Sequence, residues 1–350
     1  MKILVITQEI SRQSPVLGFF HGWLAAFSKR FESITAVCLK KGDYDLPANV
    51  SVFSLGKEDG RSRLKYVWNF FRLIIGKRSD YDAVFVHMNA EYVLLGFLIW
   101  RILGKKIVTW YNHTLGGVKP RMAFLLADRV CHTSPFAFSA GRQKSVRMPA
   151  GVDTDVFKPA AIARDTRSIL YVGRLSPLKK VDLLVRACEE LHAKGVGFKL
   201  NIYGEAPVRD KTYTESLVKI AEPLLSAGKA RFYGSVPNSK TPEIYSANLI
   251  CVNLTPKGNY DKTVPESMAC GAIPLVSSRA FSEIVPEKFF FKEDDVSDLS
   301  RRLAEIFTMP ISELDRNRQI MRARVVENES LSVLSLRLKD LFGSLWTTKR

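Results

Sequence analysis

The sequence predicts an α/β protein made of two doubly wound parallel sheets, and three observations support this prediction. The chain has 350 residues, 46% of them apolar, which suits two domains of ordinary size, each with its own buried core. Strand-like apolar stretches alternate with amphipathic helical stretches along both halves, a rhythm typical of βαβ units. Residues 149–159 are rich in turn-forming residues and predict a linker. We therefore place one domain at residues 1–158 and a second at residues 159–330.

In the first half, short stretches rich in valine, isoleucine and phenylalanine predict strands. These strands are Lys2–Ile6, Ile34–Leu39, Val52–Leu55, Ala83–His87, Ile107–Tyr111 and Arg129–Thr133. Longer amphipathic stretches between them predict helices. These helices are Gly18–Arg30, Ser62–Ile75, Tyr92–Leu103 and Pro120–Ala127. Strands that return through helices predict a parallel sheet.

The second half repeats this rhythm. Its predicted strands are Ile169–Val172, Lys199–Tyr203, Ala230–Tyr233, Leu249–Leu254 and Ile273–Val276. Its predicted helices include Val181–Ala193, Tyr213–Leu225, Pro242–Ser246 and Val296–Phe307. A last helix, residues 331–346, carries leucines and Phe342 on one face, and we expect it to pack back on the first domain.

The chain is strongly basic, with a formal net charge of +17. Residues 1–158 contain 23 Lys and Arg against 12 Asp and Glu, which leaves +11 in that half. Such an excess predicts an anionic partner, which could be nucleic acid, anionic lipid or a phosphorylated substrate.

Cysteine usage and hydropathy predict a cytoplasmic protein. The five cysteines are scattered and form no CxxC pair, which favours reduced thiols and argues against a structural zinc site. No apolar run reaches the ~18 residues that a membrane-spanning helix needs. Residues 1–6 lead into polar residues and predict a first strand rather than a signal peptide.

The segment from Thr255 to Ser278 is the most informative for function. It predicts a loop, a short helix that begins at Pro265 and Glu266, and a buried strand. A helix N-terminus after a strand favours an anion, and a carboxylate in the first turn can accept two hydroxyls of a sugar ring. Phosphate and ribose side by side indicate a nucleotide.

Two cations follow a strand of the second half. Gly173 permits a tight turn after that strand, and Arg174 and Lys179 flank the loop that leads into the next helix. Such a pair can clamp a diphosphate, Arg as a fork and Lys as a point charge. The alternative is ordinary surface charge in front of an amphipathic helix.

At this point the sequence resembles a known family. The phrases are GRLSPLKKVDLLVRA from Gly173, PAGVD from Pro149, IYGEAP from Ile202, FYGSV from Phe232 and ESMACGAIPLV from Glu266. In this order they resemble the motifs of retaining glycosyltransferases of family 4, of the bacterial group 1 type. The resemblance covers most of residues 149–290. It implies the GT-B fold, in which two Rossmann-like domains face each other across a cleft, the first binding the acceptor and the second the nucleotide sugar.

The resemblance also implies roles for residues at matching positions. Arg174 and Lys179 correspond to the pair that binds the donor diphosphate and stabilises the leaving group, where negative charge develops. Glu266 corresponds to the residue that binds the ribose, although Thr263 and Glu266 also form a capping-box pattern. The further donor-binding residues that it implies are Lys262, Thr263 and Val264 through their amides, and Gly204 in the family's G-x-G-P turn.

In the first half, His113 ends a strand and matches the family's histidine that faces the donor sugar. Gly18 matches loosely the family's glycine-rich loop near the phosphates, and a plain loop entering a helix explains it equally well. His87 also ends a strand, and there we expect packing.

One position departs from the family pattern. Where many members carry a first glutamate this chain has Gly258, followed by Asp261 and Lys262. This pattern resembles a bacterial variant in which Asp261 or Lys262 contacts the transferred sugar. A salt bridge of the loop is the alternative, and we count Asp261 among the candidate catalytic residues.

We predict no metal requirement and no cofactor, since Arg174 and Lys179 already supply positive charge to the phosphates. Three DxD triplets, beginning at Asp43, Asp80 and Asp153, are therefore ascribed to chance.

Residues 60–78 combine Lys and Arg with Tyr66, Trp68, Phe70 and Phe71, a composition that suits an anionic membrane surface. An ordinary helix with its aromatic face in the core is the alternative. The basic stretch matches no nucleic-acid-reading motif, so we expect no nucleic acid partner.

The predicted function is therefore a metal-independent retaining glycosyltransferase that uses a nucleotide-diphosphate sugar. Its expected acceptor is a glycan or a lipid-linked glycan of envelope polysaccharide synthesis, at the inner face of the cytoplasmic membrane. Two alternatives stay open: a nucleotide-sugar epimerase of the same fold, and a non-catalytic peripheral membrane protein.

Overall fold

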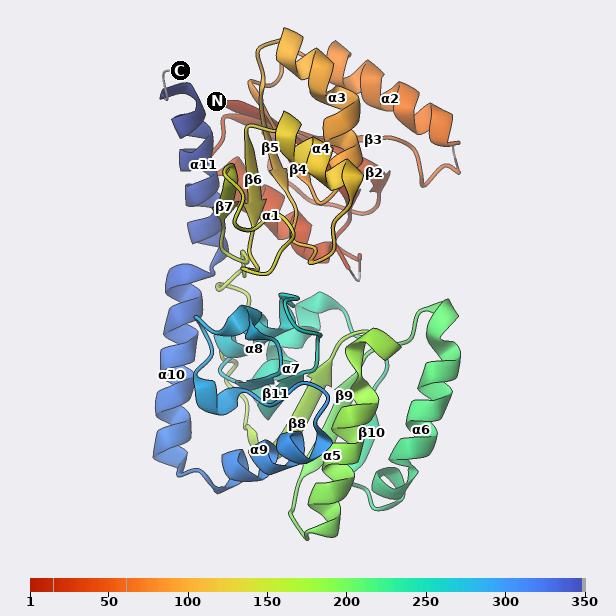
Figure 1. Ribbon diagram of the computed structural model, residues 1–350, viewed down its shortest axis with the longest axis vertical. Helices are drawn as coiled ribbons and strands as arrows, with labels where there is room; N and C mark the ends of the chain where they lie inside the picture. The colour runs from red at the N-terminus through yellow and green to blue at the C-terminus, as the bar shows by residue number, and fades with distance from the viewer. Residues whose placement is uncertain (15, 61, 348–350) are drawn as a thin grey trace. The chain divides into compact units, whose positions relative to one another are not determined.

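The computed structural model describes residues 1–14, 16–60 and 62–347. It divides into two compact units (Figure 1). The first unit contains residues 1–151 together with the C-terminal segment that begins at Leu331, and the second contains residues 152–330. The chain thus passes between the units after Gly151, within the predicted linker but before the predicted boundary at residue 158.

The first unit is built on a seven-stranded parallel sheet of order β3-β2-β1-β4-β5-β6-β7. Its strands are β1 (Lys2–Ile10), β2 (Ser33–Lys41), β3 (Val50–Ser54), β4 (Ala83–His87), β5 (Lys106–Trp110), β6 (Arg129–His132) and β7 (Ser145–Arg147). β1 runs four residues beyond the prediction because β2 continues beside it, with Glu9 paired to Lys40. β7 was not predicted, because its three residues carry no clear periodicity.

Two hydrophobic cores cover the two faces of this sheet. Alternate residues of β1 point to opposite faces, so Ile3 and Val5 enter one core and Leu4 and Ile6 the other. The first core is closed by α1 (Gly18–Ser28) and α11 (Leu331–Thr347). The second is closed by α2 (Arg63–Gly76), α3 (Ala90–Ile102) and α4 (Val118–Leu126).

The second unit has a five-stranded parallel sheet of order β10-β9-β8-β11-β12. Its strands are β8 (Asp165–Val172), β9 (Lys199–Tyr203), β10 (Ala230–Phe232), β11 (Asn248–Asn253) and β12 (Ile273–Val276). The chain moves outward from β8 to β10 and then returns to the other side of β8 for β11. With right-handed connections, this reversal distributes the helices over both faces of the sheet.

The helices form a layer on each face. α5 (Val181–Ala193) packs against α6 (Lys211–Ser226) and α9 (Val296–Thr308), whereas α8 (Thr263–Ala269) packs against α7 (Thr241–Ala247) and α10 (Ile311–Asn328). α10 was not predicted. Only Leu314, Asn317, Met321 and Val325 of its 18 residues are buried, so the sequence shows too narrow an apolar stripe.

α11 belongs to the first unit although it ends the chain. Leu334, Leu338 and Phe342 are fully buried there, and the ring of Phe342 meets that of Phe31 edge-on at 6.1 Å between centroids. No helix in the described part of the chain is both long enough and apolar enough to cross a membrane.

Candidate active site

The strand order of the second unit places a ligand site between β8 and β11. The order in which the chain adds strands reverses there, and in open parallel sheets ligands bind in the crevice at the carboxyl ends of the two strands that flank such a point. The loop after β8 carries Gly173, Arg174 and Lys179, and the loop after β11 carries Thr255 and Asp261. The fold therefore brings the predicted cations and the predicted carboxylate to one edge of one sheet.

Gly173 and Gly204 allow the loops after β8 and β9 to approach each other closely. Gly204 has φ of 148°, and a Cβ there would lie 1.8 Å from the carbonyl oxygen of Gly173. The Gly204 N–H donates to the carbonyl of Gly234 at 2.8 Å. The amide of Gly204 is thus used inside the fold, and its role toward a donor stays a prediction.

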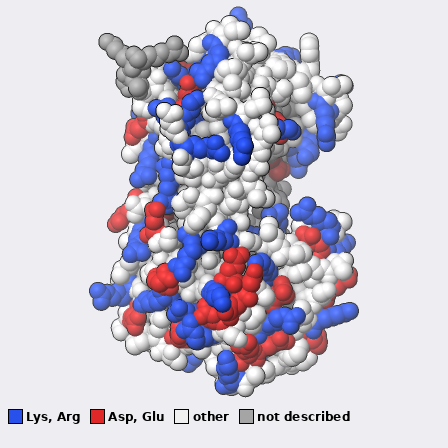
Figure 2. Space-filling view, viewed as in Figure 1, with Lys and Arg blue, Asp and Glu red and all other residues white. Residues whose placement is uncertain are grey.

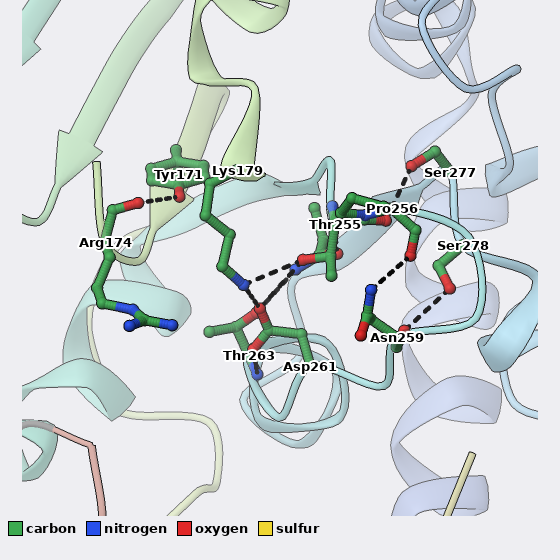
Figure 3. Close-up of polar contacts among 11 residues, drawn as sticks. Tyr171, Arg174, Lys179, Thr255, Pro256, Asn259, Asp261, Thr263, Ser277 and Ser278 are labelled. Atoms are coloured by element: carbon green, nitrogen blue, oxygen red, sulfur yellow. Dashed lines mark hydrogen bonds and ion pairs between the residues drawn. The ribbon is translucent and has the colours of Figure 1, made fainter. Parts of the chain in front are cut away.

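Arg174 lies on the exposed side of this turn. The Tyr171 hydroxyl donates to the main-chain oxygen of Arg174 at 2.9 Å and so fixes the backbone. Within the described ranges, the Arg174 guanidinium has no hydrogen-bond or ion-pair partner. Figure 3 shows its side chain extending to the same side as that of Lys179. An unpaired guanidinium beside a second cation is suited to an anionic ligand.

Lys179 ends a short 3₁₀ turn, Pro177–Lys179, and reaches across to the loop after β11 (Figure 3). Its ammonium group forms an ion pair with Asp261 and donates to the Thr255 hydroxyl at 3.2 Å. The Thr255 hydroxyl in turn lies 3.2 Å from the same Asp261 oxygen. Only 15% of the Lys179 side chain and 20% of the Asp261 side chain are exposed, so solvent screens this pair weakly.

Asp261 is ionised in this setting. Burial by itself would raise the pKa of its carboxyl, but the charge and hydrogen bond of Lys179 and hydrogen bonds from Thr263 and Thr255 outweigh it. They lower the pKa to about 2. Asp261 therefore does form a salt bridge, as the alternative interpretation expected. The bridge joins the loop after β11 to the loop after β8 and does not stay within one loop.

The loop that carries Asp261 is tied down along its length (Figure 3). The Ser278 hydroxyl donates to the Asn259 carbonyl at 2.9 Å, and the Asn259 side chain donates to the Pro256 carbonyl at 3.3 Å. The ring of Tyr260 packs on that of Phe281 with centroids 4.7 Å apart. Gly258, where many family members carry a glutamate, has φ of 88°, a backbone angle that glycine adopts readily.

Glu266 lies in the first turn of α8 and is 7% exposed. The N-cap residue of this helix, Lys262, makes no side-chain capping bond, and the Thr263 hydroxyl accepts from Asn253 and not from the Glu266 N–H. The capping-box alternative is therefore wrong. Burial raises the pKa of Glu266, an effect opposed by Lys262, and burial lowers the pKa of Lys262. Lys262 is half-buried, and its charge acts on both Glu266 and Glu329.

Two of the three amides predicted to meet a phosphate already have partners. The Thr263 N–H donates to the Asp261 carboxylate at 3.3 Å, and the Val264 N–H donates to the main-chain oxygen of Asp261 at 3.3 Å. Asp261 thus occupies donors that the sequence assigned to the ligand.

The predicted residues of the first unit lie at the carboxyl edge of its own sheet. His113 follows β5, is exposed, and meets Tyr111 edge-on at 5.3 Å between ring centroids. Gly18 is the first residue of α1, with its N–H bonded to Ser14, so it belongs to a helix and not to a glycine-rich loop. His87 is buried against Phe20, 4.5 Å between centroids, as expected for packing.

Thr255 and Tyr171 were missed as site residues. Thr255 lies two residues after the end of β11 and contacts both members of the Lys179–Asp261 pair. Tyr171, near the end of β8, fixes the Arg174 backbone. A polar side chain at the carboxyl end of a predicted strand is the signal that could have found them.

The DxD triplets make ordinary contacts. Asp43 and Asp45 pair with Arg12, and Asp80 pairs with Lys77. Asp153 accepts the N–H of Asp155. Among the described residues, no group of three or more His, Cys, Asp and Glu is arranged to hold a metal ion.

The region that holds this crevice matches a family model. Residues 152–326, half of the chain, match the family described as glycosyl transferases group 1. The chain belongs to the group 1 glycosyltransferases.

Among curated relatives, the D-inositol 3-phosphate glycosyltransferase of Acidothermus cellulolyticus is 32% identical over 145 residues, 38% of this chain and 32% of that protein. The GDP-mannose-dependent alpha-(1-6)-phosphatidylinositol monomannoside mannosyltransferase of Mycolicibacterium smegmatis is 26% identical over 238 residues, 59% of this chain and 60% of that protein. The alignments thus span between about a third and three fifths of these relatives.

Solved structures of other proteins show the same fold over nearly the whole chain. HepE of Anabaena in complex with UDP has a TM-score of 0.77 at 16% identity and covers 98% of this chain and 100% of its own. Sucrose-phosphate synthase of Thermosynechococcus elongatus has a TM-score of 0.78 at 14% identity, with both chains fully covered. At these identities the likeness establishes the fold, which is GT-B, as the sequence predicted.

Proposed function

We propose that this group 1 glycosyltransferase is a retaining enzyme that moves a sugar from a nucleotide-diphosphate sugar to a glycan or lipid-linked acceptor in envelope polysaccharide synthesis. The observation that carries the proposal is the pair of cations, Arg174 and Lys179, at the crevice between β8 and β11. Their guanidinium and ammonium groups extend to the same side of one loop (Figure 3). This pair lies within the region that matches the family.

The donor's diphosphate is the proposed ligand of these cations. As the bond between the sugar and the diphosphate breaks, negative charge grows on the leaving phosphate. Positive charges that are already fixed beside the leaving phosphate lower the free-energy barrier to bond breaking, because the protein does not have to reorganise during the reaction. Glu266 is the proposed ribose acceptor, because its carboxyl group lies in the first turn of α8 and forms no capping box there. His113 is the proposed contact to the donor sugar.

The donor class follows from what the similar proteins are said to bind. HepE is described in complex with UDP, and the mycobacterial mannosyltransferase is named for its dependence on GDP-mannose. These two nucleotides differ in the base and share the diphosphate. We therefore propose a nucleoside diphosphate sugar as donor, without a preferred base.

Retention of configuration is proposed to involve the leaving phosphate itself. Asp261 is ion-paired and Glu266 is buried beside Lys262, so neither carboxylate is a free nucleophile. The bond from the anomeric carbon to the phosphate oxygen breaks while the acceptor oxygen bonds to the same face of that carbon. The acceptor proton passes to the departing phosphate oxygen, which Arg174 and Lys179 hold in place. This route needs no metal ion.

A thermal-shift panel tests the donor site. UDP, GDP, ADP, CDP and their common sugar conjugates are added to the wild type, to Arg174→Ala and to Arg186→Ala, an exposed control on α5. A ligand at a hundred times its Kd should add ~2.7 kcal/mol of stability. We expect a shift with one nucleotide, unaffected by EDTA, lost in Arg174→Ala and kept in Arg186→Ala. The absence of any shift in wild-type protein would refute the donor site.

Product analysis separates the transferase from the epimerase alternative. A transferase releases the free nucleoside diphosphate only when an acceptor is present, whereas an epimerase returns the sugar nucleotide with one inverted ring carbon. ¹H NMR of the sugar nucleotide distinguishes these products. Nucleotide binding without either reaction would favour the non-catalytic alternative.

An anionic membrane surface is the proposed partner of the first unit. α2 buries only Asn69, Phe70 and Ile74, and it exposes Leu64 to 83% and Trp68 to 70%. The alternative, an ordinary helix with its aromatic face in the core, therefore describes Phe70, which is buried, but not Trp68, which is exposed. Figure 2 shows basic side chains with few acidic ones between them over α2 and α3. Exposed apolar side chains among cations are typical of a helix that lies on a bilayer.

A further inference from the structure

The crevice between β8 and β11 already contains an anion that belongs to the protein. The Asp261 carboxylate accepts from three donors of different kinds: the Lys179 ammonium, the Thr255 hydroxyl and the Thr263 main-chain N–H. An ammonium, a hydroxyl and an amide that converge on one oxyanion form the kind of set that binds a phosphate. Asp261 therefore satisfies the donors that a ligand's phosphate requires.

The ion pair also joins the two loops between which the proposed ligand site lies. Lys179 comes from the loop after β8 and Asp261 from the loop after β11, the two strands at which the order of strand addition reverses. The pair thus bridges the crevice instead of lining one side of it. Arg174, on the same loop as Lys179, stays outside this pair (Figure 3). The two cations that are predicted to bind phosphate therefore differ. The Arg174 guanidinium is available at once, whereas the Lys179 ammonium is occupied by Asp261.

We propose that Asp261 is a built-in competitor of the donor's phosphate, which a ligand has to displace from Lys179 before that lysine can bind it. This inference rests on the proposed role of Lys179 in binding the donor. A phosphate first meets the unpaired Arg174 and then exchanges with the Asp261 carboxylate. The same exchange in reverse helps to release the nucleoside diphosphate after transfer, because Asp261 takes back Lys179.

The cost of this competition is a lower apparent affinity. When the binding-competent state is only a fraction of the population, the measured Kd rises by the inverse of that fraction. Removal of the competing charge should thus tighten the binding of any anion that uses Lys179. Close charge pairs are worth enough to change affinity by about tenfold or more.

Calorimetry with inorganic pyrophosphate tests the inference without knowledge of the base or the sugar. The proteins are the wild type, Asp261→Asn, Asp261→Ser as a second variant, and Asp165→Asn as matched control. Asp165 pairs with Lys199 at 3.0 Å at the opposite end of β8, so its substitution removes the same charge and a more exposed Asp–Lys pair away from the crevice. Thermal melting establishes that each variant is folded.

We expect both Asp261 variants to bind pyrophosphate about tenfold tighter than the wild type, and Asp165→Asn to bind like the wild type. Lys179→Met in the Asp261→Asn background should abolish the gain. Equal or weaker binding by the Asp261 variants, or a gain that survives Lys179→Met, would overturn the inference and leave Asp261 as a residue that positions Lys179. Such a result leaves the proposed function standing, because the donor site is refuted by the absence of a nucleotide-dependent shift in wild-type protein and not by the affinity of the Asp261 variants.

Discussion

At the scale of single residues, the contacts of Asp261 and Lys179 decide how the crevice responds to pH. The folded-state pKa of Asp261 is about 2, below the ~3.9 of an unfolded aspartate. The ion pair therefore contributes stability above pH ~4, and this contribution is lost as the pH falls toward 2. From the size of the shift we expect about 2 kcal/mol at neutral pH.

Urea unfolding of wild type and Asp261→Asn between pH 7 and pH 2 measures this contribution. The wild type should be more stable at pH 7, and the two curves should converge at the acid end. A difference that persists unchanged at pH 2 would contradict the assignment.

Gly204 is a second residue whose role is fixed by its immediate surroundings. Alanine there would bring a Cβ into the Gly173 carbonyl oxygen, which is backbone and cannot swing away. We expect Gly204→Ala to destabilise the protein by about 3 kcal/mol or more. Gly228→Ala is the matched control, since Gly228 also has a positive φ but no atom within 4 Å of its Cβ, and it should cost only ~1 kcal/mol. Equal losses in chemical denaturation would show that backbone strain alone matters at Gly204.

At the scale of elements, α8 is held at its carboxyl end by three arginines. Arg164, Arg318 and Arg322 donate to the main-chain oxygens of Cys270, Gly271 and Ala269. These bonds satisfy carbonyls that a helix end leaves without partners. They fix the helix whose first turn carries Glu266, and they explain why polar α10 packs there.

Loss of one of these arginines should weaken the second unit. We expect Arg322→Ala to cost about 2 kcal/mol, because a buried carbonyl loses a charged donor. Arg316→Ala, an exposed position of the same helix, should be nearly neutral. Guanidinium unfolding of both variants measures the difference, and an equally small effect for Arg322→Ala would rule out a stabilising cap.

α2 is the element that we expect to meet the membrane. Reversal of two of its charges, Arg63→Glu with Lys65→Glu, should weaken binding to vesicles that contain phosphatidylglycerol by at least about tenfold, since each basic residue near an anionic surface contributes ~1 kcal/mol. Lys29→Glu with Arg30→Glu, a pair of exposed cations after α1, is the control with the same change of net charge. Vesicle co-sedimentation measures both, and equal losses would point to net charge in place of a specific surface.

At the scale of the whole molecule, the first unit needs both ends of the chain. Phe342 of α11 is fully buried in the core that α1 also closes. Phe342→Ala should destabilise the first unit by about 3 kcal/mol, whereas Leu336→Ala, which is 45% exposed, should cost little. In calorimetric scans, Phe342→Ala should lower the melting temperature of the first unit's unfolding transition. That transition is recognised as the one whose melting temperature does not rise directly when nucleotide is added. A loss confined to the nucleotide-stabilised transition would contradict the assignment of α11.

The sequence by itself determined the fold class, the order of most strands and helices, and the family. This succeeded because parallel strands buried on both faces read as continuous apolar stretches, and because glycines such as Gly173 are required where loops approach closely. It also singled out Arg174, Lys179, Asp261 and Glu266 as candidate site residues by their motifs. It missed β7 and α10, whose residues carry little apolar periodicity.

Only the tertiary structure decided how these residues meet. That Asp261 pairs with Lys179 depends on β11 lying beside β8, although 82 residues separate the two side chains along the chain. That Gly18 lies in a helix, and that Thr263 and Glu266 form no capping box, depends on contacts with Ser14 and Asn253. Local patterns specify which side chains are available, and the packing of strands and loops distant in sequence determines which partners they find.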